Sequence, residues 1–240
     1  KDAEARMKAY RDETIKIAQE FSEVADRATS QLAIGDARIA ERKANANKGK
    51  LADVKEKYQS ARFKCGKYPE LMSEAVDGLL RTLILMKDYN GAKAEANSII
   101  EKFKKEGAKH LPLLPGAYTV LGQANLAEAV DFETKGATIQ AKNAYAEARW
   151  NFLHVIAQFF DSDEYVAAAH YYAGICYDKL KDLESDANEK AVRHWKLIVE
   201  NFPKSTIRAR AEKELERLGI KTKAAENPAE KKDPAKPAPT

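Results

Sequence analysis

The chain has 240 residues, of which 44% are hydrophobic and 32% are charged, and its 41 basic and 37 acidic residues leave a net charge of +4. The charge is spread without a basic stripe, which argues against a nucleic-acid-binding protein, and the longest apolar runs fall far short of the roughly 20 residues that span a membrane. We expect a soluble, elongated molecule with a thin core.

Apolar residues recur every three or four positions from Ala3 to Ala28, as in an amphipathic helix. The set comprises Met7, Tyr10, Ile17, Phe21, Val24 and Ala28, with Thr14 at the polar position. We therefore predict an N-terminal amphipathic helix over residues 1–29. Its heptad spacing permits three interpretations, of which the first is favoured: the first helix of the repeat domain, a coiled-coil seam, or a stalk leading from a lost membrane anchor.

Residues 30–220 are predicted to form helical hairpins, because prolines are rare there and strand-like alternation is absent. A helix with Leu32, Ile34, Ala37 and Ile39 should break near 45–50 and be followed by one with Leu51, Val54, Tyr58, Ala61 and Phe63. Further pairs are expected at 70–87 and 90–106, 116–134 and 137–160, and 163–182 and 187–201. A last helix, 205–218, should end at Gly219, a typical C-cap residue.

The sequence contains an internal repeat in which residues 34–63 align without a gap onto residues 121–150, at an offset of 87. Ten of the thirty positions are identical, among them Tyr58 with Tyr145 and Ala61 with Ala148. Hairpins with one apolar face each, repeated along a chain, are typical of an α-solenoid. We expect the repeated Ala to allow close helix packing and the repeated Tyr to fill the groove between helices.

The hairpins resemble tetratricopeptide repeats. Residues 169–203 carry Gly174, Tyr177, Leu180 and Pro203 in the order of that family, and Gly78, Asp88, Tyr89 and Ala92 match it earlier in the chain. The packing glycines of the four hairpins would be Gly35, Gly78, Gly122 and Gly174. Their spacings of 43, 44 and 52 exceed the period of about 34 of the family, so the repeats are stretched. The resemblance implies an all-α solenoid of about four hairpins that binds a partner protein or peptide in its concave groove.

The segment from Asn201 to Ile220 resembles the last hairpin of bacterial envelope repeat proteins, namely the Tol-Pal-associated periplasmic repeat proteins and the outer-membrane assembly lipoproteins. This implies a periplasmic, cell-envelope protein, with cytoplasmic localisation left open. Because the first residue is Lys1, we expect a removed N-terminal piece, which could have held a membrane tether. Residues 221–240 are rich in Pro, Lys and Ala and are predicted to be a disordered or partner-bound tail.

Transferring the ligand-facing positions of the family nominates residues at one, four and five positions after each packing glycine. The partner-binding residues implied in this way are Asp36, Gln123, Leu126, Ile175, Asp178 and Lys179, with Tyr171 as an aromatic anchor one turn before Gly174. The polar members would hold the backbone or the charged ends of a partner.

No motif for a metal, a phosphate or a dinucleotide occurs, so no cofactor, metal or small-molecule substrate is expected. His110, His154, His170 and His194 lack the i,i+4 spacing of a metal pair and are interpreted as structural. Cys65 and Cys176 are predicted to be buried apolar residues rather than a disulfide.

Three functions remain open. The first is a non-catalytic binding scaffold, and the second is a structural subunit of a larger complex, attached through the N-terminal helix and the tail. An enzyme that uses Cys65 or Cys176 with a histidine is the third and least favoured, so we expect no enzymatic activity.

Overall fold

The computed structural model describes residues 2–105 and 113–221, and these residues form an all-α fold, which confirms the predicted class. The predicted helix 90–106 runs to the edge of the described part, and the tail 222–240 lies outside it. The elements in chain order are α1 (Asp2–Asn45), α2 (Leu51–Lys64), the 3-10 turn η1 (Cys65–Lys67), α3 (Pro69–Leu85), α4 (Tyr89–Lys105), α5 (Leu113–Thr134), α6 (Thr138–Gln158), α7 (Asp163–Lys179), α8 (Ala187–Asn201) and α9 (Arg208–Arg217).

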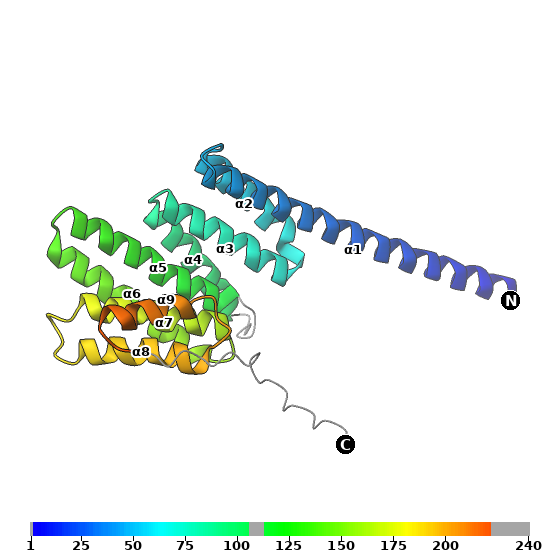
Figure 1. Ribbon diagram of the computed structural model, residues 1–240. Helices are drawn as coiled ribbons and strands as arrows, with labels where there is room; N and C mark the ends of the chain where they lie inside the picture. The colour runs from blue at the N-terminus through cyan, green and yellow to red at the C-terminus, as the bar shows by residue number, and fades with distance from the viewer. Residues whose placement is uncertain (1, 106–112, 222–240) are drawn as a thin grey trace, which may run out of the picture.

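Successive helices form four hairpins, α1/α2, α3/α4, α5/α6 and α7/α8, which stack in order and are followed by α9 (Figure 1). Each first helix contacts the next one: α1 packs on α3, α3 on α5, α5 on α7, and α7 on α9. The second helices α2, α4, α6 and α8 lie farther apart from one another, and the ion pair of Arg62 with Glu95 bridges α2 and α4 through long side chains. Because the first helices lie close together and the second helices lie farther apart, the stack curves with the first helices on its inner side.

Several helices end at a residue in the left-handed backbone conformation, which turns the chain back. Gly136, between α5 and α6, has φ 73°, and Gly219, after α9, has φ 75°, as expected for the predicted joint and C-cap. After α5, the N–H of Gly136 donates to the carbonyl of Glu133 and the N–H of Ala137 donates to that of Phe132, at 3.0 and 2.9 Å. This is the hydrogen-bond pattern of a Schellman motif.

Three of the four predicted packing glycines lie against an aromatic ring. A Cβ atom at Gly78, Gly122 or Gly174 would overlap the ring of Tyr58, Phe152 or Trp195, respectively. Helix backbones and aromatic side chains therefore approach more closely there than any other residue would allow. Gly35 differs, because a Cβ atom there would meet nothing within 4 Å.

The repeated aromatic and small residues take the places that the sequence predicts. Tyr58 and Tyr145 are each 1% exposed, and Ala61 and Ala148 are fully buried. Phe63, expected on an apolar face, is instead 89% exposed, and the aligned Trp150 is also on the surface.

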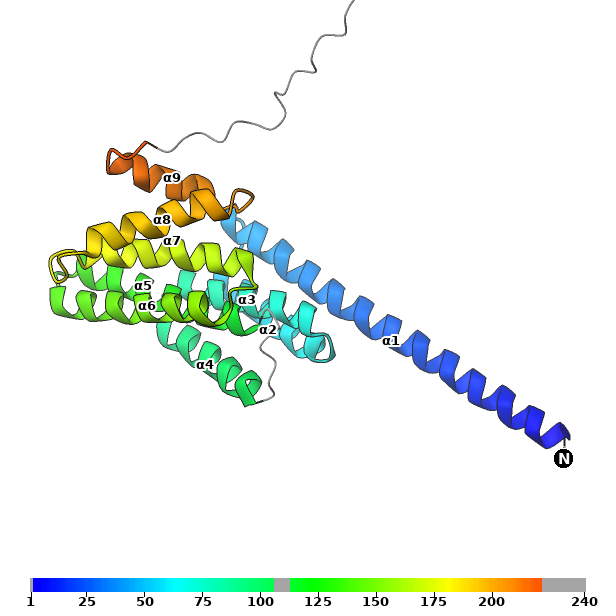
Figure 2. The ribbon, with the colours of Figure 1, turned by 90° about the horizontal axis from the view of Figure 1, so that it is seen from below.

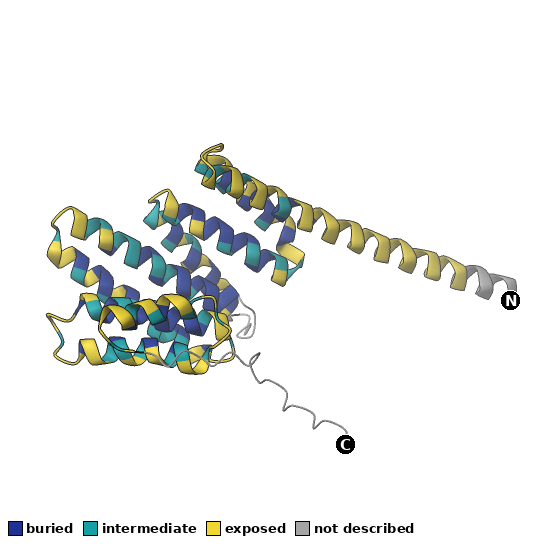
Figure 3. Ribbon diagram, in the orientation of Figure 1, coloured by how far each residue is buried: buried dark blue, intermediate teal, exposed yellow. Residues whose placement is uncertain are grey.

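The N-terminal region is one continuous helix of 44 residues, so the two helices expected on either side of residue 29 are joined within α1. Its first half projects away from the stack in both views (Figures 1 and 2). Figure 3 shows the described part of this half, residues 9–29, exposed all round. Tyr10, Phe21 and Val24 are 74%, 73% and 67% exposed. The favoured interpretation of this stretch as a packed solenoid helix is therefore wrong, because the stack begins only near residue 30.

The core consists of three hydrophobic clusters in series along the stack, as a solenoid requires. The first joins α1 to α5, the second joins α5 to α7, and the third joins α7 to α9. Cys65 lies in the first cluster and Cys176 in the second, both buried and both free thiols, as predicted.

Candidate functional site: the inner groove

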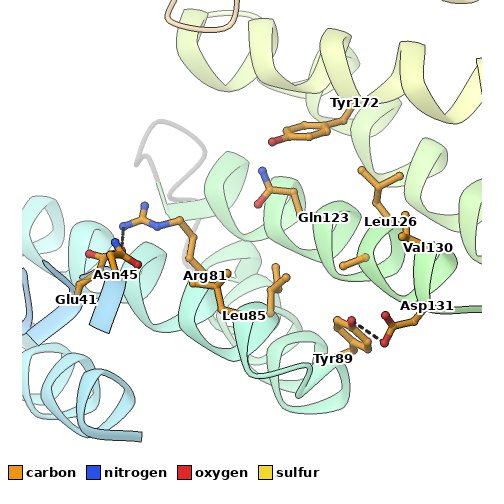
Figure 4. Close-up of a pocket in the computed structure, with 12 residues that line it drawn as sticks. Glu41, Asn45, Arg81, Leu85, Tyr89, Gln123, Leu126, Val130, Asp131 and Tyr172 are labelled. Carbon is orange, nitrogen blue, oxygen red and sulfur yellow. Dashed lines mark hydrogen bonds and ion pairs between the residues drawn. The ribbon is translucent and has the colours of Figure 1, made fainter. Parts of the chain in front are cut away.

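The inner side of the stack holds a groove of about 530 Å³ between α1, α3, α5 and α7 (Figure 4). Its wall is a mixture of apolar side chains and a few charged ones. The lining residues are Glu41, Asn45, Arg81, Ile84, Leu85, Tyr89, Gln123, Leu126, Ala127, Val130, Asp131 and Tyr172. They come from first helices and from the start of α4, so the stacking order of the hairpins creates the groove.

The middle of the groove is apolar and open to solvent. Leu85 of α3 is 58% exposed and Val130 of α5 is 45% exposed, while Leu126 and Tyr172 are half-buried. Large apolar side chains that gather in a concave surface indicate a place where a ligand or a partner protein is bound.

An ion pair lies at each end of the groove. At one end, Arg81 lies 3.7 Å from Glu41, whose carboxylate also accepts a 2.6 Å hydrogen bond from the hydroxyl of Tyr58. At the other end, Asp131 accepts hydrogen bonds from Lys87 Nζ and the Tyr89 hydroxyl at 2.9 and 3.0 Å. The hydrogen bond from Lys87 holds the pKa of Asp131 below its usual value, so this carboxylate stays ionised.

The tyrosines at both ends remain protonated at neutral pH. Burial, followed by the hydrogen bond to Glu41, raises the pKa of Tyr58 to about 12. Burial, followed by the hydrogen bond to Asp131, likewise raises the pKa of Tyr89 to about 12. Both hydroxyls therefore act as fixed donors that orient the carboxylates.

Ion pairs link each first helix to the next. The pairs are Glu41–Arg81, Lys87–Asp131, Glu133–Lys179 and Asp178–Arg217, with N···O distances of 3.7, 2.9, 2.8 and 2.8 Å. Because each pair bridges neighbouring hairpins, the charges that flank the groove also help to set the spacing of its walls.

The structure places two of the seven nominated residues in the groove, Gln123 and Leu126. Tyr171 is only 6% exposed, lies in the third core cluster and is covered by Arg210, whose guanidinium is 4.5 Å from the ring. Its neighbour Tyr172 lines the groove in its place.

The other nominated residues are engaged elsewhere. Asp178 accepts a hydrogen bond from Arg217, Lys179 donates to Glu133, and Ile175 packs against the third core cluster. Asp36 is exposed and lines a separate depression between α1 and α2. A role of any of these residues in binding stays a prediction.

Sequence reasoning missed Leu85, Val130 and Arg81, which the groove presents most openly. The transferred positions lie one, four and five residues after each glycine, whereas Arg81, Leu85 and Val130 lie three, seven and eight residues after theirs. The sequence signal that could have found them is the apolar residues near the C-terminal ends of α3 and α5. These residues lie one or two helical turns beyond the packing glycines.

A comparison of the chain with models of protein families, with curated proteins and with solved structures finds no match. Within residues 2–105 and 113–221, no group of three or more His, Cys, Asp or Glu side chains is arranged to hold a metal ion.

None of the helices in the described part of the chain combines the length and the apolar character that a membrane span requires.

Proposed function

We propose that the chain is a non-catalytic scaffold of the tetratricopeptide-repeat type that binds a peptide or a helix of a partner protein in the inner groove. The observation that carries this proposal is the pair Leu85 and Val130, two large apolar side chains exposed in a concave wall. The glycine–aromatic contacts at Gly78, Gly122 and Gly174 support the assignment to this repeat class.

The charges of the groove suggest what the partner carries. An apolar segment that fills the space over Leu85 and Val130 would meet Arg81 at one end and Asp131 at the other. We expect a partner sequence with two or more apolar anchors, an acidic group on one side of them and a basic group on the other. The carboxylates of the groove are engaged with cations and tyrosine hydroxyls, which suits binding rather than proton transfer.

Replacing the exposed apolar side chains tests this proposal. Leu85→Glu and Val130→Glu should each weaken partner binding by roughly tenfold or more, because a charge would be buried against the apolar anchors of the partner. Affinity capture from a lysate of the source cells, read by mass spectrometry, identifies the partner, and titration with the purified partner then measures the loss.

Ile139→Glu is the matched control, since Ile139 is 75% exposed on α6 and does not line the groove. Its affinity should equal that of the wild type. Equal affinities for all three variants would rule out the groove as the binding surface.

We also propose a place in the bacterial cell envelope, supported by the likeness of residues 201–220 to envelope repeat proteins. Fractionation of the source cells into cytoplasm, periplasm and membrane, followed by immunodetection, tests this. A purely cytoplasmic protein would contradict it.

The second candidate function, a structural subunit of a larger complex, is supported by the projecting half of α1. Its exposed aromatic residues, Tyr10 and Phe21, offer an attachment surface outside the groove. Under this alternative, Phe21→Glu removes the protein from its complex, whereas Val130→Glu leaves it in place.

A further inference from the structure

One side of α1 carries a long stripe of mainly small and apolar residues that no other element of the described chain covers. The α1 stripe consists of Tyr10, Thr14, Ile17, Phe21, Val24, Ala28, Gln31, Leu32, Gly35 and Ile39. Within the described residues, α1 contacts only α2, η1 and α3. All members of the stripe except the half-buried Gly35 are exposed, with Leu32 at 71% and Ile39 at 52%.

The α1 stripe lies opposite the side by which α1 joins the stack. The packed side consists of Ser30, Ala33, Ile34 and Ala37, all buried. Successive residues of a helix are rotated by about 100°, which places Leu32, Gly35 and Ile39 about half a turn away from that side. The stripe therefore continues from the projecting half onto the outer surface of the first hairpin, where a second helix can lie without meeting the stack.

Gly35 forms an unfilled notch in this stripe. Gly78, Gly122 and Gly174 each receive the ring of a Tyr, Phe or Trp from a neighbouring helix. At Gly35 the same space is empty, although Leu32 and Ile39 flank it as exposed apolar neighbours. By analogy with the three filled sites, the missing contact is a large, aromatic side chain from another helix.

We propose that α1 pairs with α1 of a second copy as an antiparallel, two-fold symmetric coiled coil centred between Ser22 and Glu23. The heptad spacing of the stripe fixes the possible registers, and this register places Tyr10 of one copy on Gly35 of the other. The empty notch is then filled by an aromatic residue of the same sequence.

The same register matches every remaining layer by size and polarity. Ile17 faces Ala28 of the second copy, and Phe21 faces Val24, so larger side chains oppose smaller ones. Thr14 and Gln31, the two polar residues of the stripe, face each other, and the Gln31 amide can donate to the Thr14 hydroxyl oxygen. A parallel, in-register pair would instead oppose Phe21 to Phe21 and leave Gly35 facing Gly35, with a void between them.

The residues that flank the stripe carry no like-charge conflict in this arrangement. Glu20 lies beside Arg27 of the second copy, a favourable pair that forms twice by symmetry. Arg27 also bonds Glu70 of its own chain at 2.9 Å, and the five N–H donors of its guanidinium suffice for both carboxylates. On the other flank, Ala18 lies beside Ala25 of the second copy, and the aliphatic part of Arg11 covers Leu32.

The contact is large enough for a dimer. From Tyr10 to Gly35 the paired helices run for about 38 Å. Two aromatic side chains on each copy, each able to bury about 150–250 Å², together with Ile17, Val24 and Leu32, bring the total to roughly 1,000 Å², the size that a biological interface should reach.

The first test measures the mass of the full chain by sedimentation equilibrium over a range of concentrations. The wild type should be a dimer, Phe21→Glu should raise the dissociation constant by about 100-fold, and Gly35→Leu should raise it by about tenfold, because the leucine fills the notch. A monomeric wild type at about 100 μM, or a trimer, would overturn the proposal and leave the stripe to a partner of another sequence.

Gly35→Leu should fold at least as well as the wild type, since its Cβ meets no atom and leucine favours the helix. Circular dichroism and thermal melting check this. Lys16→Leu is the matched control, because Lys16 lies on the projecting half but on the side opposite the stripe, and its dimer should be unchanged. An unchanged dissociation constant for Gly35→Leu would contradict the notch contact.

The second test determines the direction of the helices. A nitroxide spin label at Glu13→Cys, which flanks the stripe, should give a distance of about 30 Å between the two copies of an antiparallel pair, against about 10 Å for a parallel one. The native Cys65 and Cys176 are buried, so the labelled wild type serves as the blank. The shorter distance would overturn the antiparallel arrangement.

Discussion

A hydrogen bond between Tyr165 and Asp77 ties two hairpins together across a third. The Tyr165 hydroxyl of α7 donates to the Asp77 carboxylate of α3 at 3.0 Å. The bond passes over Gly116 of α5, where a Cβ atom would lie 3.0 Å from Asp77 Oδ1. Burial raises the pKa of Asp77, so its charged form is costly and depends on this donor.

Replacing either partner of this bond should have unequal effects. Tyr165→Phe leaves the Asp77 carboxylate without its donor and should lower the free energy of unfolding by about 1–3 kcal/mol. Asp77→Asn removes the buried charge and should cost less than about 1 kcal/mol. Urea unfolding at pH 7, followed by circular dichroism, compares the free energies of unfolding of the two variants. Equal decreases would show that burying the Asp77 charge is not costly.

Two histidines form a second buried polar contact. The Nδ1 atoms of His170 and His194 are 2.7 Å apart, so one ring donates and the other accepts. Phe202 and Tyr177 pack beside the pair. Burial lowers the pKa of both imidazoles to about 4, and the proximity of His170 and Arg193 adds to the effect at His194.

Because both imidazoles are buried in the neutral form, we expect the free energy of unfolding to decrease in mild acid. The folded-state pKa lies below the unfolded value of about 6.5, so the stabilisation is complete above pH 6.5 and is lost as the pH falls toward 4. Between pH 7 and pH 5 we expect the free energy of unfolding to fall by about 4 kcal/mol, about 2 kcal/mol from each imidazole. His194→Gln should reduce that fall by about half in urea titrations at each pH. An unchanged slope would show that the histidines do not cause it.

At the scale of the helix, two glycines with open surroundings should respond in opposite ways to the same substitution. Neither Gly136 nor Gly35 has an atom within 4 Å of the position of a Cβ, but Gly136 has φ 73° in a turn and Gly35 lies inside α1. Gly136→Ala should cost about 1 kcal/mol through backbone strain, whereas Gly35→Ala should gain about 0.5–1 kcal/mol through helix propensity. Thermal unfolding at low protein concentration measures both, and a gain at Gly136 would contradict the assigned turn.

Sequence periodicity predicted most helices well, because buried residues at every third or fourth position define them. It did not reveal that residues 1–29 project from the stack, since an exposed stripe and a buried one have the same period, and it divided α1 into two helices. Phe63 shows the same limit. Its spacing is that of a core residue, but no helix among the described residues covers that side, so it is 89% exposed.

At the scale of the whole molecule, the order of the hairpins was predictable but the composition of the groove was only partly so. Gln123 and Leu126 follow from the position of Gly122 alone. Leu85, Val130 and Tyr172 depend on how far each hairpin is rotated against the next, and that rotation is set by contacts distant in sequence, such as Lys87 with Asp131 and Glu133 with Lys179. The repeats of this chain are longer than those of the family and unequal in length. Ligand-facing positions counted from each glycine therefore do not fall at equivalent places in successive hairpins.

The two free thiols lie in different parts of the stack, and burial raises the pKa of both, so neither is reactive while its surroundings stay closed. Cys65 becomes open to an alkylating reagent when the α1–α5 cluster loosens, and Cys176 when the α5–α7 cluster does. The rate at which each cysteine is alkylated therefore measures how often its own cluster opens. Different rates at Cys65 and Cys176 would show that the stack opens locally from one end, and equal rates would show that it unfolds as one unit.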